Sequence, residues 1–245
     1  MAKDKRFSRA WDAIEEVPLR VAGMRRSAGA ALGMADRRRR LLLLAPLAVL
    51  LPRAVGAAPA LTATPRQALG PFYPLRPDPA AGNDLRVVDG KEPAAGSAQG
   101  KPLTIVGRVL DTAGRPQAGV LVEIWQTNAH GRYHHPHDDS PQPLDPRFRG
   151  YGRATSSPDG DYRFVTIEPV AYPGRTPHVH FRLSRAGREL LVTQMYLPGA
   201  AGAGNERDGL FMSVREPAAR ELLLGVRDPG TPGTLRFDIV VEAGR

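Results

Sequence analysis

Short apolar segments separated by turn sequences dominate the chain from Leu103 onwards, and they constrain its fold more than any other feature. Strand-like segments are flanked by typical turn sequences, namely Asp111-Thr-Ala-Gly, Ser157-Pro-Asp-Gly and Arg185-Ala-Gly. Only residues 214–224 favour a helix, and that helix is short. Many short strands with turns between them predict an all-β fold, a β-sandwich with long loops and little helix. The strands are expected at residues 103–110, 119–126, 161–167, 178–184, 189–196 and 234–241.

The charge of the chain is concentrated at its N-terminus. Residues 1–58 carry 12 Lys and Arg against 5 Asp and Glu, so they account for +7 of the formal net charge of +9. The remaining residues are close to neutral, and the basic balance therefore gives no indication of a nucleic-acid partner. The sequence contains no cysteine, which excludes disulfides, thiolate metal sites and a lipid anchor on a cysteine.

Residues 1–58 have the pattern of an N-terminal extension with an export signal. Four arginines, Arg37 to Arg40, precede the apolar run from Leu41 to Leu51, and small residues suited to cleavage follow. The run is too short to span a bilayer, so no stable membrane anchor is expected. The consecutive arginines are similar to a twin-arginine signal, which predicts export to the periplasm or the medium. The alternative is an ordinary basic tail on a cytoplasmic protein. The candidate translation starts are Met1, Met24 and Met34.

Residues 59–101 are rich in Ala, Pro and Gly, which predicts an extended arm rather than a packed element. The distinctive segment of this arm is Thr64-Pro-Arg-Gln-Ala-Leu-Gly-Pro-Phe-Tyr-Pro74, in which aromatic residues lie between prolines. These aromatics can anchor the arm either on the domain that follows or on a neighbouring subunit. The chain is therefore divided into an extension of residues 1–58, the arm, and a β-sandwich domain of residues 102–245.

A loop that leads directly into a strand carries the side chains best suited to chemistry, Tyr172, Arg175, His178 and His180. Because successive side chains of a strand point to opposite faces, His178 and His180 share one face and Val179 lies on the other. Two imidazoles on one face supply half of a metal site. A pair of packed, hydrogen-bonded histidines is the alternative.

A second polar loop, residues 125–139, contains Trp125, Tyr133 and the other histidines of the chain. A histidine in a loop has no strand to fix its direction, so these histidines are expected to be solvated. Trp125 can border a site or belong to the core. The loop histidines are His130, His134, His135 and His137.

Several separated blocks of the sequence resemble the intradiol ring-cleavage dioxygenases, and among these the iron-bearing (beta) subunits of the protocatechuate-cleaving enzymes. The resemblance covers about residues 64–198, and the blocks follow one another in the family's order. It implies a β-sandwich core of the intradiol dioxygenase type and a role in the catabolism of aromatic compounds. The blocks are residues 64–74, Val122-Glu-Ile-Trp-Gln with Gly131-Arg-Tyr, Leu144-Asp-Pro-Arg-Phe, Tyr162–Ile167 and residues 172–181.

The resemblance implies one Fe(III) per chain as the cofactor. Phenolate oxygen is a hard donor that favours ferric iron, whereas a site that binds O2 on Fe(II) typically has two histidines and a carboxylate. The implied reaction is cleavage of a protocatechuate-like catechol between its two hydroxyls by O2, which yields a muconate-type diacid. Tyr172 would be displaced by the substrate and serve as a base. The implied iron ligands are Tyr133, Tyr172, His178 and His180.

The resemblance also implies roles for Arg175 and Gln194. Arg175 takes the place of an arginine that stabilises negative charge on the substrate ring. Gln194 takes a position near the substrate, and an ordinary polar residue of a strand is the alternative. Gly174 departs from the family, because a bulky aromatic usually stands there, and this leaves the identity of the catechol open. A homo-oligomer, with or without a related iron-free subunit, is implied as well.

Two other classes of protein are compatible with parts of the pattern. A cupin-like metal enzyme also uses a His-x-His pair, but it needs a carboxylate ligand several residues later, for which Glu189 is a poor candidate. A non-catalytic, transthyretin-like binding sandwich needs no tyrosine ligands at all. A visible charge-transfer band from Fe(III) and tyrosinate would distinguish the dioxygenase from both.

Overall fold

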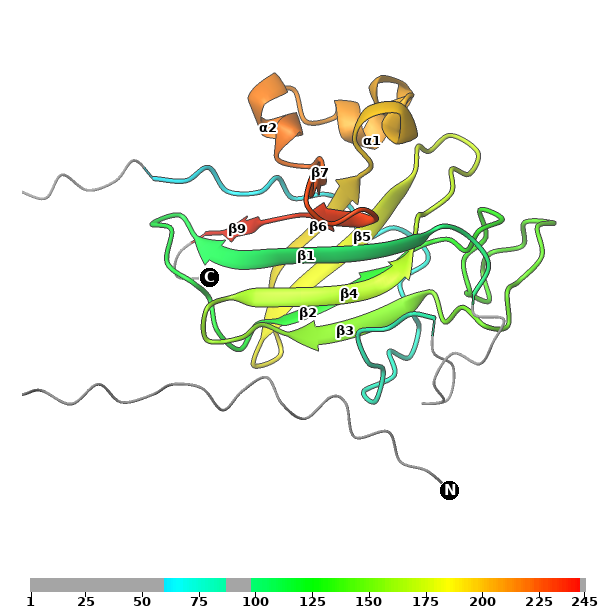
Figure 1. Ribbon diagram of the computed structural model, residues 1–245, viewed down its shortest axis with the longest axis horizontal. Coiled ribbons are helices and arrows are strands. Elements are labelled where there is room, and N and C mark those ends of the chain that lie inside the picture. Colours follow the sequence, from blue (N-terminus) through cyan, green and yellow to red (C-terminus); the bar gives the residue numbers. More distant parts are fainter. Residues whose placement is uncertain (1–59, 87–97, 243–245) are drawn as a thin grey trace, which may run out of the picture. The chain divides into compact units, whose positions relative to one another are not determined.

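Two β-sheets packed face to face form the domain in the computed structural model, which describes residues 60–86 and 98–242 (Figure 1). The first sheet has the strand order β4-β1-β8-β7, with β9 also paired to β1, and the second has the order β3-β2-β5-β6. The predicted export signal lies outside the described residues. The strands are β1 (Pro102–Asp111), β2 (Leu121–Trp125), β3 (Tyr151–Thr155), β4 (Asp161–Ile167), β5 (His178–Arg185), β6 (Arg188–Tyr196), β7 (Val226–Arg227), β8 (Thr234–Arg236) and β9 (Ile239–Val241).

The all-β prediction is confirmed, and four strands, β1, β4, β5 and β6, begin and end within one residue of the expected positions. The strand expected at 234–241 is interrupted, because β8 and β9 pair with β1 at two separate places. The strand β3 was not predicted, because Gly152 and Arg153 break its apolar pattern and pairing with β2 supplies its order.

Helical segments are few and short in the described part of the chain. The helix expected within 214–224 is α2 (Pro217–Glu221), and α1 (Gly209–Met212) comes before it. Two 3-10 turns, η1 (Gly199–Gly202) and η2 (Asn205–Arg207), were not predicted. None of the helices among the described residues is long and apolar enough to cross a membrane.

The hydrophobic core lies between the two sheets and determines which face of β5 carries the histidines. Ile105 and Phe164 of the first sheet are fully buried in this core together with Phe181 of the second. Because side chains alternate along a strand, the burial of Phe181 in the core turns His178 and His180 to the outer face of the second sheet.

Gly107, in the middle of β1, permits a close approach between strands. A Cβ at this position would lie 2.0 Å from the carbonyl oxygen of Phe237, which also accepts a hydrogen bond from the Tyr162 hydroxyl. We expect Gly107→Ala to lower the free energy of unfolding by about 3 kcal/mol, because the strands must separate and a buried hydrogen bond weakens. Urea unfolding measures this change.

The matched control is Gly82→Ala, because a Cβ at Gly82 meets nothing within 4 Å. This control should change the free energy of unfolding by less than about 0.5 kcal/mol. Equal stability of the Gly107→Ala and Gly82→Ala proteins would show that the strands do not approach as closely as described.

The arm lies on its own domain, which is one of the two arrangements that the sequence left open. Its described parts, residues 60–86 and 98–101, contain no helix and no strand. The backbone N–H of Thr64 donates to the carbonyl of Val240, and that of Gln67 donates to the carbonyl of Val192, both at 2.9 Å. Val240 belongs to β9 and Val192 to β6, so the arm passes from the edge of the first sheet onto the sheet that bears the histidines.

Candidate metal centre and active site

The predicted ligand side chains converge on the outer face of the second sheet. The Nε2 atoms of His178 and His180 are 3.2 Å apart. The hydroxyl of Tyr133 lies 3.1 Å from Nε2 of His180 and 3.4 Å from Nε2 of His178. The ring of Tyr172 has its centroid 5.6 Å from the rings of both Tyr133 and His178. The structure therefore brings together two strand residues and two loop residues that are distant in the sequence.

Register within the sheet positions the histidines. Trp125 on β2 lies opposite His180, and Gln194 on β6 lies opposite His180 on the other side. The rings of Trp125 and His180 are stacked, with centroids 4.8 Å apart and planes at 11°. Trp125 therefore borders the site, which is one of the two positions that the sequence left open for it. Its stacked ring fixes the plane of the His180 imidazole.

A tight turn directs Tyr133 toward the histidines. The side-chain oxygen of Asn128 accepts hydrogen bonds from the backbone N–H groups of His130 and Arg132. Gly131 has φ of 80°, and a Cβ there would lie 2.8 Å from the carbonyl oxygen of Ala171. Only glycine permits this approach without strain, and it brings the loop of Tyr133 against the loop of Tyr172.

Burial keeps both histidines neutral. The Nδ1 of His178 donates to the carbonyl of Thr176 at 2.6 Å, so its Nε2 presents a lone pair to the centre of the site. Burial, with a smaller contribution from Arg175, lowers the pKa of His178 to about 4. Burial and the neighbouring His178 lower the pKa of His180 well below its usual range. Burial, reinforced by Tyr172, raises the pKa of the Tyr133 hydroxyl well above its usual value.

This donor set fits a hard metal cation. Atoms bound about 2.0–2.1 Å from a metal, at angles between a right angle and the tetrahedral angle, lie roughly 2.8–3.4 Å from one another. The separations of 3.1, 3.2 and 3.4 Å among Tyr133, His178 and His180 fall in that range. A cation at their centre would also oppose the high pKa of the buried Tyr133 and favour the phenolate.

The site depends on tyrosine rather than on acidic residues. Within residues 60–86 and 98–242, no group of three or more His, Cys, Asp or Glu side chains could hold a metal ion. Glu189 forms ion pairs with Arg66 at 2.8 Å and with Arg182 at 3.3 Å. It therefore does not act as the carboxylate ligand that a cupin-like site requires.

Arg175 links the tyrosines to the loop that precedes α1. Its Nη1 donates to the hydroxyl of Tyr172 at 3.2 Å, and its Nη2 donates to the side-chain oxygen of Gln194. Its Nε donates to Asp208 at 2.8 Å. Gln194 is fully buried, and its amide nitrogen donates to the carbonyl of Ala68 at 3.2 Å. The predicted pair Arg175 and Gln194 is thus in direct contact, with the guanidinium directed toward Tyr172.

Asp208 is a site residue that the sequence analysis missed. Its side chain is completely buried. One carboxylate oxygen accepts from Arg175 and from the backbone N–H of Thr176, while the other accepts from the N–H groups of Leu210 and Phe211 at the start of α1. The only sequence signal was an aspartate at a helix N-cap position, before a helix too short to be predicted.

The arm supplies a second group of residues that the sequence analysis did not place in the site. The ring of Phe72 stacks on Tyr133, with centroids 4.6 Å apart, and meets the edge of Tyr172 at 6.4 Å. A Cβ at Gly70 would lie 3.2 Å from Cε1 of His180. The aromatic segment of the arm was recognised in the sequence, but nothing there indicated that it covers the histidines.

The prediction that the loop histidines are solvated is correct for His134 and His137, which are exposed, holds in part for His130, which is half-buried, and is wrong for His135. His135 is buried, and its ring lies 5.8 Å from that of Phe72. Its Nδ1 accepts a hydrogen bond from the backbone N–H of His137 at 3.1 Å. His135 is buried because the arm covers this loop, a contact between segments far apart in the sequence.

Comparison with known proteins points in the same direction. A family model described as Dioxygenase matches residues 70–243. The protocatechuate 3,4-dioxygenase beta chain of Burkholderia cepacia is 40% identical over 159 residues, which are 60% of this chain and 67% of that protein. Hydroxyquinol 1,2-dioxygenase of Nocardioides simplex is 30% identical over 204 residues, 73% of this chain and 64% of that protein. The chain thus spans about two thirds of the length of these relatives.

A solved structure with a similar fold is the dioxygenase domain of a dioxygenase carbohydrate-binding protein fusion from Streptomyces sp. SirexAA-E. It superposes with a TM-score of 0.56 at 32% sequence identity, and the match covers 74% of this chain and 99% of that domain. These comparisons give no support to a transthyretin-like binding protein or to a cupin.

Proposed function

Because this chain belongs to the intradiol ring-cleavage dioxygenases, we propose that it opens a catechol ring between the two hydroxyl-bearing carbons, with O2 as the co-substrate. The observation that carries this proposal is the convergence of Tyr133, His178 and His180 within 3.4 Å of one another, beside Tyr172 and Arg175. The substrate class is a protocatechuate-like catechol, and the product is a muconate-type diacid.

We propose one Fe(III) per chain, held by Tyr133, Tyr172, His178 and His180. The support is chemical, because phenolate oxygens are hard anionic donors and neutral imidazoles complete a set suited to a trivalent cation. When bound, this ion supplies Lewis-acid activation and a template for the two catechol oxygens. The hydrogen bond from His178 to Thr176 would keep that imidazole oriented as a ligand.

The two tyrosines differ in how deeply they are buried, and this difference suggests a different role for each. Tyr133 is 2% exposed and lies beneath Phe72, whereas Tyr172 is only partly buried and its hydroxyl bonds to Arg175. Tyr172 is therefore the side chain free to swing away and accept a proton from a substrate hydroxyl. Tyr133 would stay in place.

Arg175 would stabilise negative charge that develops on the substrate ring. Its guanidinium already points to the Tyr172 hydroxyl, and Asp208 and Gln194 hold it there. A fixed cation of this kind contributes most where charge appears in the transition state. Phe72 and Trp125 would keep water from the reacting atoms, because they cover Tyr133 and His180.

We expect the protein to purify coloured, with about one iron per chain, because two phenolate ligands favour Fe(III) over divalent ions. Metal analysis by mass spectrometry and a visible absorption spectrum test this together. Removal of the iron by a chelator should abolish the colour and the ring cleavage, and Fe(III) should restore both. A colourless protein with stoichiometric zinc would contradict the proposed cofactor.

Two further proposals depend on the sequence and the family alone. Export through a twin-arginine-type signal within residues 1–58 would allow a folded, metal-loaded protein to be transported. Assembly would be as a homo-oligomer, with or without a related iron-free subunit.

A further inference from the structure

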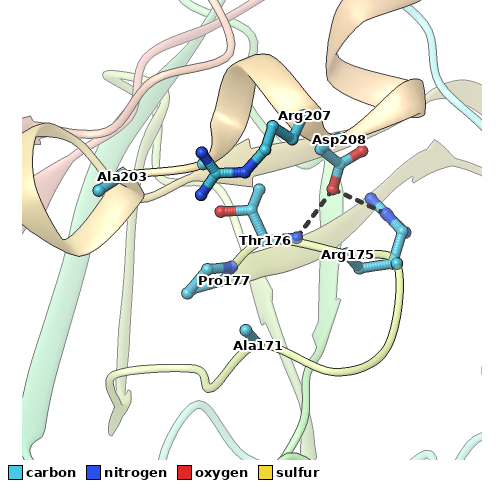
Figure 2. Close-up of a pocket in the computed structure, with 9 residues that line it drawn as sticks. Ala171, Arg175, Thr176, Pro177, Ala203, Arg207 and Asp208 are labelled. Carbon is cyan, nitrogen blue, oxygen red and sulfur yellow. Dashed lines mark hydrogen bonds and ion pairs between the residues drawn. The ribbon is translucent and has the colours of Figure 1, made fainter.

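A cavity of about 280 Å³ adjoins Arg175, between the loop that carries Tyr172 and the loop before α1 (Figure 2). Arg175 lines this cavity, and its guanidinium donates to the Tyr172 hydroxyl, so one residue belongs to both the cavity and the candidate metal centre. Ligand pockets usually exceed about 300 Å³. A cavity of this size therefore suits part of a ligand whose remainder is held next to it.

Small residues make most of the cavity wall. Ala171, Pro177 and Ala203 present short apolar side chains to it (Figure 2). Gly174 also lines it, and a Cβ at Gly174 would meet nothing within 4 Å. The wall is therefore open at Gly174, beside Arg175.

The charge on the cavity wall that is not neutralised by a neighbouring group is positive. Asp208 is already bonded to Arg175 and to the backbone N–H of Thr176. Figure 2 shows the Arg207 side chain extending toward Thr176 and Pro177. The guanidinium of Arg207 packs over Gly204, where a Cβ would lie 3.2 Å from Nη2. Among the described residues, no hydrogen bond or ion pair engages the Arg207 side chain, so its donors remain available.

We propose that this cavity binds the carboxylate end of a short acidic side chain on the catechol ring, with Arg207 as the partner of the carboxylate. This inference rests on the proposed ring cleavage and names its substrate class, catechols with an acidic chain of propionate size. A guanidinium matches a carboxylate with two parallel hydrogen bonds. The cavity, at about 280 Å³, is of a size to take such a chain while the ring lies next to it.

The test compares two substrates of equal length, 3-(3,4-dihydroxyphenyl)propionate and its neutral amide, on the iron-loaded parent and on Arg207→Gln. The parent should prefer the acid in kcat/KM. Arg207→Gln should lower the ratio of acid to amide about tenfold to a hundredfold, the range for losing a hydrogen bond to a charged group. The change should appear mainly in KM, since Arg207 is remote from the reacting atoms.

The matched control is Arg188→Gln, which removes an equal charge at the exposed first residue of β6. This variant should retain the parent's ratio of acid to amide. Anaerobic calorimetry gives a readout that is independent of turnover, and Arg207→Gln should weaken binding of the acid by the same factor as it changes the ratio.

Two results would overturn the inference and leave ring cleavage intact: no preference of the parent for the acid, or an unchanged ratio in Arg207→Gln. If the iron-loaded parent cleaves neither compound and neither catechol nor protocatechuate, the proposed ring cleavage fails instead. In that case calorimetry still tests whether the cavity binds a carboxylate. Tighter binding of the acid than of the amide, with this difference lost in Arg207→Gln, would support the proposed site. Equal binding of the two compounds would refute it.

Discussion

His180→Ala is expected to lose iron, visible colour and ring cleavage together. The imidazole of His180 lies within 3.2 Å of both its neighbours in the donor set, Tyr133 and His178, and its ring stacks on Trp125. Removal of an outer partner of a ligand typically costs about 10- to 100-fold in metal affinity, so loss of a ligand itself should cost more. Iron content per chain, the visible spectrum and turnover are the three measurements.

The control is His137→Ala, which removes an exposed imidazole from the loop that carries Tyr133. That protein should keep its iron, its colour and its turnover. Circular dichroism would establish that His180→Ala is folded, so that loss of iron is not a consequence of unfolding. A folded His180→Ala protein with full iron, colour and activity would remove His180 from the ligand set.

The histidine pair was the part of the site most accessible from sequence. The alternation of side chains along β5 predicted that His178 and His180 share a face, and the burial of Phe181 in the core decides which face that is. The two tyrosines were placed by family resemblance alone. Tyr133 is brought close to Tyr172 by the contact of Gly131 with the carbonyl of Ala171. This contact joins two loops and leaves no periodic signal in the sequence.

The missed elements have a common physical cause. Helix α1 has four residues, too few for a helical period, and so its N-cap Asp208 could not be connected with Arg175. The strand β3 is ordered by pairing with β2 rather than by its own apolar pattern. The interruption between β8 and β9 occurs at Phe237, whose carbonyl is held against β1 through Gly107 and Tyr162. Each depends on tertiary contacts.

Arg175→Ala should retain iron and colour and still bind a catechol, yet lose kcat by about 100-fold or more, the scale for removing one transition-state charge partner. The proposed iron ligands do not include Arg175, whose hydrogen bonds go to Tyr172, Gln194 and Asp208 and not to either histidine. Steady-state ring cleavage and anaerobic substrate titration of the iron spectrum separate the loss of turnover from a loss of binding.

Two companion variants distinguish the charge of Arg175 from its position. Arg175→Lys should recover only part of the activity, because an ammonium cannot bond to Tyr172, Gln194 and Asp208 at once as the planar guanidinium does. Asp208→Asn should fall between Arg175→Ala and the parent in kcat, since it weakens the support of the guanidinium without removing the charge. Unchanged turnover in iron-loaded Arg175→Ala would exclude the guanidinium from the reaction, and Arg175 would then serve only to join the loop of Tyr172 to α1.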